Sequence, residues 1–425
     1  MSGSYWIETL GCPKNQVDSE KVAGSLLEQG YHPAESAELA DLVVVNTCAF
    51  IGPAREESIE TILDLSERRH QGARLVVTGC LAARAGEELA EAMPEVDLVA
   101  DLGVPITLGS GPRWRPNTAT VPALDLLELP RRAALSPWAY VKIAEGCDRA
   151  CGFCAIPSFR GPQRSRDAAA ILAEVESLAV PEIVLVAQAL ASYGRDLGQG
   201  AQLASLVRAV GERAEWVRLL YLYPSSLNDE LIETIAGTGV PYFDLSLQHV
   251  SRPLLRRMRR WGEAERFLER IEKIRQLAPD AALRSSFIFG YPGEDEDDQD
   301  RLLEFLRAAQ LDWVGLFPFS PEEGTYALGL DRPVPPELAM ERLRECAELQ
   351  DGITASRRDR LVGTEVRVLV DAPGLARSSR EAPEIDGVIH VPLELEVGAF
   401  TTVRITATEG PDLHAVEQHA QMGAA

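Results

Sequence analysis

The stretch EGCDRACGFCAIP, from Glu145 to Pro157, carries three of the seven cysteines of this 425-residue chain within eight residues. Cys147, Cys151 and Cys154 have the spacing C-x3-C-x2-C and follow a strand-like run, AYVKIAEG (139–146). Glycines and charged residues between them predict a polar loop, so three unrelated buried core cysteines are a poor explanation. Cysteines grouped at a short fixed spacing instead indicate a metal site.

The missing fourth ligand narrows the kind of metal site. A structural zinc site has four protein ligands, and the sequence has no fourth Cys or His near this loop. A cubane 4Fe-4S cluster held by three thiolates leaves one iron open, and that iron can bind S-adenosylmethionine and support its cleavage to a 5′-deoxyadenosyl radical. With Phe153 before its last cysteine, the loop resembles the signature of the radical S-adenosylmethionine superfamily.

Strand-like and helical runs alternate on the C-terminal side of this loop, which predicts an α/β fold. Six such units fit between residues 137 and 357, whereas a closed eight-unit barrel typically needs about 250 residues. We therefore expect a partial (β/α)6 barrel of the TIM type with an open side. Its strand candidates are AYVKIAEG (139–146), EIVLVA (182–187), WVRLLYLY (216–223), YFDLSLQ (242–248), ALRSSFIFG (282–290) and DWVGLFPF (312–319).

Two further domains and a linker are expected around the barrel. Residues 1–102 alternate strand and helix, which predicts a small parallel α/β domain. Residues 103–136 are rich in Pro and Gly without periodicity and are interpreted as a linker. Residues 358–425 contain short β runs separated by Gly and Pro, which predict a small antiparallel β barrel.

Three more cysteines recur in the N-terminal domain, one after each strand candidate. Cys12, Cys48 and Cys80 end the runs ETLGC, VVVNTC and VVTGC and lie 36 and 32 residues apart. One such cysteine is usually a small residue at a tight strand exit. Three in register favour a shared site, because ligands bind outside the carboxyl ends of parallel strands. The sequence therefore predicts a second open 4Fe-4S cluster.

Two open clusters on one chain suggest sulfur chemistry. Over nearly its whole length the chain resembles the methylthiotransferases, which couple a three-cysteine N-terminal domain, a radical barrel and a small C-terminal TRAM-like β barrel. Four segments resemble the RimO type, which methylthiolates the β-carbon of an aspartate in ribosomal protein S-twelve. They are ETLGCPKNQVDSE, NTCAFI, AEGCDRACGFCAIPSFRG and ARSSREAPEIDG. The resemblance implies S-adenosylmethionine, an electron donor of the flavodoxin or ferredoxin type, and no catalytic acid or base from a side chain.

Charge bears on the substrate. The chain has a net charge of −23, and residues 362–425 carry ten carboxylates against four arginines. An acidic surface suits a basic ribosomal protein and repels nucleic acid. The alternative, a tRNA adenosine methylthiotransferase, is therefore disfavoured. A non-catalytic electron carrier is disfavoured too, because such proteins usually hold closed four-thiolate clusters.

The S-adenosylmethionine pocket is less defined by the sequence. Strand ends of such barrels carry ligand groups, and superfamily members use similar positions, so the resemblance implies cofactor contacts from Phe153, Gln188, Gln248, Arg284, Phe289 and Gly290. A strand cap for the glutamines and an ion pair for Arg284 are alternatives of equal weight. His249 is predicted to be structural and Cys346 to lie in a helical core. The chain departs from the family pattern at Ala189, Leu190, Leu220 and Ser246.

Location follows from what the sequence lacks. No run of eighteen apolar residues is present, so no membrane span is expected. The first residues, MSGSYWIETLGC, lack the basic and apolar segments of a signal peptide. We therefore expect a cytoplasmic protein, where cysteines are more often metal ligands than disulfides.

Overall fold

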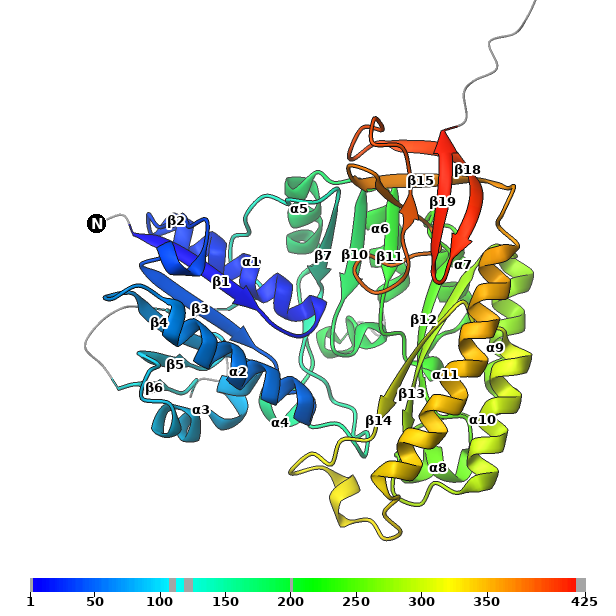
Figure 1. Cartoon of the computed structure of the whole chain (residues 1–425), viewed down its shortest axis with the longest axis horizontal. Coiled ribbons are helices and arrows are strands. Elements are labelled where there is room, and N and C mark those ends of the chain that lie inside the picture. The colour runs from blue at the N-terminus through cyan, green and yellow to red at the C-terminus, as the bar shows by residue number, and fades with distance from the viewer. Residues whose placement is uncertain (1–2, 107–111, 118–124, 199–201, 418–425) are drawn as a thin grey trace, which may run out of the picture.

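A computed structural model of the chain describes residues 3–106, 112–117, 125–198 and 202–417. Parts of the predicted linker (107–111 and 118–124) and the outermost residues of the first and last predicted domains lie outside the described residues. Figure 1 shows three bodies: an N-terminal α/β unit on one side, a larger α/β unit beside it, and a small β barrel at one end. The α/β class and the three-part architecture are confirmed.

The N-terminal unit is a six-stranded parallel sheet with the order β2-β1-β3-β4-β5-β6. Every residue of β3 is buried, as expected for a parallel strand covered by helices on both faces. The short strand β6 lies inside the predicted linker, where Trp114 pairs with Val99 and packs on Gly86. The strands are β1 (Ser4–Thr9), β2 (His32–Pro33), β3 (Leu42–Thr47), β4 (Arg74–Gly79), β5 (Leu98–Ala100) and β6 (Trp114–Arg115); the helices are α1 (Pro13–Glu28), α2 (Gly52–Arg68) and α3 (Cys80–Ala92).

The larger unit contains six parallel strands in two hydrogen-bonded groups, β7-β10-β11 and β12-β13-β14. A bridge between Leu222 and Leu245 joins the groups, and no pairing among the described strands joins β14 back to β7. The barrel is therefore partial and open, as predicted. Its strands are β7 (Trp138–Lys142), β10 (Glu182–Val186), β11 (Trp216–Leu219), β12 (Tyr242–Gln248), β13 (Ala282–Phe289) and β14 (Trp313–Pro318).

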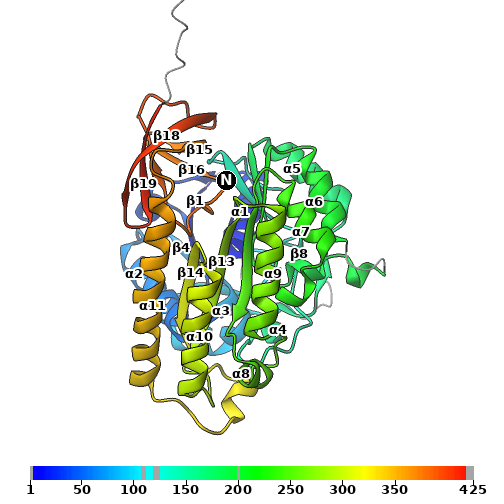
Figure 2. The ribbon, with the colours of Figure 1, turned by 90° about the vertical axis from the view of Figure 1, so that its right-hand side faces the viewer.

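Helices cover the outside of this partial barrel, as Figures 1 and 2 show. Their apolar stripes form one large core with the strands, and Cys346 of α11 is completely buried in it, as its helical spacing predicted. The helices are α5 (Ala168–Leu178), α6 (Leu203–Gly211), α7 (Asp229–Ala236), α8 (Arg252–Arg257), α9 (Ala264–Leu277), α10 (Glu296–Ala309) and α11 (Pro336–Asp359), with the short α4 (Ile156–Arg160) after the cysteine loop.

The acidic run EDEDDQD (294–300) spans the start of α10. Asp295 does cap α10 through a capping box with Asp298. However, Glu294 turns inward, where its carboxylate accepts from the Gly290 N–H at 2.6 Å and from Arg342 at 3.0 Å. The run is therefore only partly solvated, because these donors compensate a buried carboxylate.

The C-terminal unit is a closed barrel with the order β15-β16-β17-β19-β18. It packs on the N-terminal ends of the larger barrel's strands: the Trp216 and Phe400 rings lie 4.8 Å apart, and Arg218 and Arg377 both bind the buried Glu182 carboxylate, each at less than 3 Å. The opposite, carboxyl ends of those strands therefore stay free for a site. The strands are β15 (Glu365–Ala372), β16 (Leu375–Ser378), β17 (Ile389–His390), β18 (Phe400–Glu409) and β19 (Asp412–Glu417). Among the described helices, none is long and apolar enough to cross a lipid bilayer.

Candidate active site

The three N-terminal cysteines lie at the carboxyl ends of neighbouring strands. Cys12 precedes α1, Cys48 follows β3, and Cys80 is the first residue of α3 directly after β4. Gly11 adopts a φ of +92°, and a Cβ there would lie 2.8 Å from the Cys48 Sγ. Only glycine fits this approach, so the Cys48 thiol lies against the turn that carries Cys12.

Burial governs the ionisation of these thiols. It raises the pKa of Cys48 to about 11, and the neighbouring Cys80 and Cys12 add to that rise. Burial also raises the pKa of Cys80, against the charge of Arg160. At Cys12 burial is outweighed by Lys14, by backbone donors and by Arg160, so its pKa is lowered. The three thiols are therefore close enough for their charges to affect one another's pKa, and Arg160 lies beside them.

The second triplet lies in a loop clamped on both sides. The Gly152 N–H donates to the Met258 carbonyl at 2.8 Å, and the Gly152 carbonyl accepts from Ala327 at the same distance. Burial raises the pKa of Cys147, and that of Cys154 to about 12, and the other thiols of the loop contribute to both rises. The loop thus holds its three thiols close together and partly out of water.

Two arginines that were not predicted as site residues contact this loop. The Arg260 guanidinium donates to the Cys151 Sγ at 3.3 Å, while Arg149 and Arg260 stack on the Tyr223 ring at 3.4 and 4.3 Å from its centre. Their positive charge offsets the charge of deprotonated thiols. Arg260 comes from a segment about 110 residues downstream, and no pattern in the sequence marks it.

Arg160 connects the two triplets. It ends α4, directly after the cysteine loop, and its guanidinium donates to the Cys80 Sγ at 3.0 Å and to Asn15 at 2.7 Å. The same group forms ion pairs with Asp18 at 2.9 Å and Glu145 at 3.3 Å. Arg160 is almost completely buried. A positive charge from the segment after the barrel loop therefore lies against a thiol of the N-terminal triplet.

The residues present fit iron–sulfur clusters. All seven cysteines are free thiols. Among the described residues, no three His, Cys, Asp or Glu side chains are grouped so that they could hold a single metal ion. Buried polar atoms without a partner lie on described residues beside the loop, namely both side-chain amide atoms of Gln163, the Gln188 Oε1 and the Arg149 Nε. Buried polar atoms normally have a hydrogen-bond partner, and a polar ligand bound beside the loop would supply one.

Comparison with known proteins now gives the family. Residues 4–101 match the uncharacterized protein family UPF0004, residues 141–306 the radical SAM superfamily and residues 362–416 the TRAM domain. A ribosomal protein uS12 methylthiotransferase RimO from Moorella thermoacetica is 43% identical, covering 94% of this chain and 95% of the relative. A protein of the same name from Myxococcus xanthus is 40% identical, covering 96% and 90%. The chain belongs to the RimO family.

A solved structure agrees with this RimO-family fold. The radical S-adenosylmethionine methyltransferase TsrM from Kitasatospora setae superposes with a TM-score of 0.50 at 14% identity, covering 82% of this chain and 89% of that one. At this identity the likeness concerns the fold alone. The resemblance to methylthiotransferases seen in the sequence is therefore confirmed through the full-length relatives.

In this RimO-family chain the expected cofactor-pocket residues do not all lie together. Gln188 donates to Glu145, two residues before the cysteine loop, and the Phe153 ring meets Tyr291 edge-on at 6.5 Å. Gln248 ends β12 with a φ of +72°. Phe289 is completely buried and Gly290 follows it at the end of β13. Phe153 thus lies in the cysteine loop, and the other four positions lie at or just after the carboxyl ends of β10, β12 and β13.

Arg284 lies elsewhere. It is the third residue of β13, towards the C-terminal β barrel, and it pairs with Asp244 at 3.3 Å and Asp386 at 3.4 Å. These contacts match the alternative role predicted for Arg284, that of an ion-paired barrel residue. A contact between Arg284 and the cofactor stays a prediction. At the departures from the family pattern, Leu190 and Leu220 are completely buried in apolar cores, and the Ser246 carbonyl accepts from Arg260.

His249 was predicted to be structural, and its surroundings agree. Its ring is buried, and Nδ1 accepts from the Ser251 N–H at 3.0 Å. Burial, followed by the charge of Arg342, lowers the pKa of His249 from 6.5 to about 3. Between these values the unfolded chain binds a proton that the folded chain does not. The stability from a neutral His249 is therefore complete above pH 6.5 and is lost as the pH falls towards 3.

A His249→Asn variant tests this assignment, because an Asn oxygen can still accept from Ser251. We expect the free energy of unfolding of the wild type to fall with decreasing pH more steeply than that of the variant, by up to about 1.4 kcal/mol per pH unit. Urea denaturation at pH 7.5 and pH 5 measures the difference. Equal slopes for the two chains would show that His249 does not titrate on unfolding.

Proposed function

We propose that this chain transfers a methylthio group to the β-carbon of an aspartate in ribosomal protein uS12. The observation that carries the proposal is the pair of three-thiol sites, on two separate domains, linked through the buried Arg160. Full-length relatives bear the name ribosomal protein uS12 methylthiotransferase. Because that substrate belongs to the ribosome, we assign the chain to the cytoplasm.

We assign one open 4Fe-4S cluster to each triplet. Cys12, Cys48 and Cys80 hold the first, and Cys147, Cys151 and Cys154 hold the second, which also binds S-adenosylmethionine. When bound, these groups supply the one-electron cleavage of S-adenosylmethionine and a place for the sulfur that is transferred. The electron comes from a donor of the flavodoxin or ferredoxin type.

The chain's own residues position these groups and keep water away. Arg149 and Arg260 bring positive charge to the cysteine loop. Lys14, two residues after Cys12, lies 3.5 Å above the Tyr221 ring of the barrel, so the N-terminal site is held against the open side of the barrel. Proximity of this kind, rather than acid or base catalysis, is the protein's contribution.

Glu145 and Gln188 are assigned to the cofactor pocket. The charges of Lys142 and Arg160 outweigh the effect of burial and hold the pKa of Glu145 at about 2. Glu145 is therefore an anion that accepts from the Gln188 amide and leaves the Gln188 oxygen unpaired and buried. That oxygen is an acceptor available to the ammonium group of S-adenosylmethionine.

The function is tested by anaerobic reconstitution with iron and sulfide, followed by incubation with S-adenosylmethionine, dithionite and either purified uS12 or bulk tRNA. We expect mass spectrometry to find one methylthio group in place of one hydrogen on an aspartate of uS12, and none on tRNA. The acidic C-terminal domain supports this choice, because it repels a phosphate backbone. Modification of tRNA alone would overturn the substrate assignment.

A further inference from the structure

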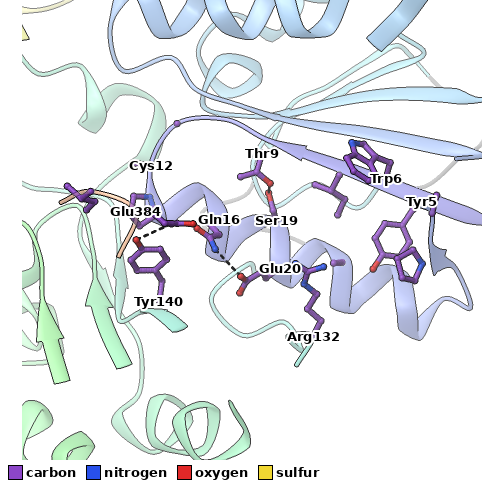
Figure 3. A pocket seen from close by; sticks show the side chains of 17 residues that line it. Tyr5, Trp6, Thr9, Cys12, Gln16, Ser19, Glu20, Arg132, Tyr140 and Glu384 are labelled. Atoms are coloured by element: carbon purple, nitrogen blue, oxygen red, sulfur yellow. Dashed lines mark hydrogen bonds between the residues drawn. The ribbon is translucent and has the colours of Figure 1, made fainter. Parts of the chain in front are cut away.

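A groove of about 590 Å³ runs along the N-terminal domain and ends at Cys12. In Figure 3 Tyr5 and Trp6 lie at one end of it, and Cys12, Tyr140 and Glu384 lie at the other. Its walls come from β1, from α1, from Arg132 before the barrel and from residues 384–385 of the C-terminal β barrel. A surface built by all parts of the chain and leading to a proposed cluster ligand is suited to a substrate.

One wall of the groove is a free sheet edge. Strand β1 pairs with β3 from Tyr5 to Thr9, but among the described residues its other edge pairs with β2 only at Ser4 and Tyr5. The Leu10 N–H donates to the Asn46 carbonyl of β3. Because the backbone groups of successive strand residues point to opposite edges, the N–H and C=O of Ile7 and Thr9 point to the unpaired edge. Residues 6–9 are half-buried. About 13 Å of strand edge is thus available in line with β2.

Charge in the groove favours a basic occupant. Glu384 is exposed and forms no ion pair among the described residues; only the Tyr140 hydroxyl donates to its side chain, at 3.2 Å. Its φ of +64° is a strained conformation for a residue with a side chain, and such strain gathers at functional sites. Glu20 adds a second carboxylate, which is paired with Arg131, and Arg132 is the one cation among the described residues that line the groove.

We propose that this groove binds an extended, basic segment of uS12, which adds a strand to the free edge of β1 next to Cys12. This inference rests on the proposed function and extends it by naming the binding surface. Backbone hydrogen bonds from Ile7 and Thr9 supply affinity in such strand addition, and side-chain contacts select the partner. Glu384 and Glu20 receive basic side chains, and the segment's next residues reach the space beside Cys12.

The strand edge is tested with Ile7→Pro. Proline removes the outward N–H and blocks pairing on that edge, and edge positions are where strands tolerate it. We expect affinity for purified uS12 to fall at least about tenfold, the equivalent of losing one or more backbone hydrogen bonds. Fluorescence anisotropy of labelled uS12 measures this, and far-UV circular dichroism with bound-iron content verifies the fold.

The charge contribution is tested independently with Glu20→Gln combined with Glu384→Gln, which keeps side-chain size. Glu28→Gln on the exposed end of the same helix is the matched control. We expect the double variant to weaken uS12 binding several-fold and to reduce its salt dependence, and the control to bind like the wild type. Hydrogen–deuterium exchange of the peptide 4–10 should slow when uS12 is added to the wild type.

The outcomes separate the two proposals. Undiminished uS12 binding by both groove variants, or unchanged exchange in peptide 4–10, would overturn the groove while leaving the methylthiotransferase assignment intact. A wild-type chain that neither binds nor modifies uS12 would overturn both. If Ile7→Pro failed to fold, weaker uS12 binding by the double variant, together with slower exchange at β1 of the wild type when uS12 is added, would still support the groove.

Discussion

Cys151→Ala is expected to reduce 5′-deoxyadenosine formation to the background rate, whereas Cys48→Ala keeps that reaction and stops methylthio transfer. The reason is the separation of the two triplets: Cys151 lies in the barrel loop, and Cys48 lies after β3 of the N-terminal domain. Removing a ligand lowers the occupancy of a metal site. Each variant loses a thiolate of one of the two proposed clusters and should therefore lose about half of the bound iron.

Cys346→Ala is the matched control. Cys346 is completely buried in the helical core, and no other cysteine contributes to the shift of its pKa. Both reactions and the iron content of Cys346→Ala should therefore equal those of the wild type. Iron analysis, electron paramagnetic resonance and chromatography of the nucleoside product measure the three quantities. If Cys48→Ala still produced methylthiolated uS12 at the wild-type rate, the second cluster would have no part in the transfer.

The grouping of the proposed cluster ligands into two triplets was predictable from the sequence. Three cysteines within eight residues predict one site, and three others at the ends of successive strand candidates predict another, since the carboxyl ends of parallel strands lie at the same edge of a sheet. The structure places Cys12, Cys48 and Cys80 where that argument expects them. Periodicity likewise placed Cys346 in a core.

Long-range partners were not predictable. Arg160 stands in the quoted segment SFRG, yet nothing in its neighbours reveals that it reaches Cys80 and Asp18, which lie 80 and 142 positions earlier. Arg260 meets the cysteine loop across 109 positions. Arg284 lies on the predicted strand, but its partner could not be predicted. It pairs with Asp386 because the C-terminal barrel covers that end of the strand.

Arg160→Met is expected to destabilise the chain by about 3–5 kcal/mol, the usual cost of breaking a buried ion pair from one side. Arg160 and Asp18 are almost completely buried, and Glu145 mostly so. In the wild type Arg160 and Lys142 balance these two carboxylates. In the variant Lys142 alone faces both, and a buried negative charge is left without a partner. Methionine fills much of the volume of the arginine stem, so the loss reflects charge rather than a cavity.

Arg68→Met supplies the comparison, because Arg68 also binds two carboxylates, Glu38 and Asp64, but at an exposed position. Water and side-chain entropy make such surface pairs nearly neutral, so the urea midpoint of Arg68→Met should stay close to that of the wild type while that of Arg160→Met falls sharply. Arg160 links α4 to the N-terminal domain. In Arg160→Met that domain should therefore be the first to unfold as the urea concentration rises. Identical midpoints for Arg160→Met and the wild type would mean that the link between the two cysteine sites contributes nothing to folding.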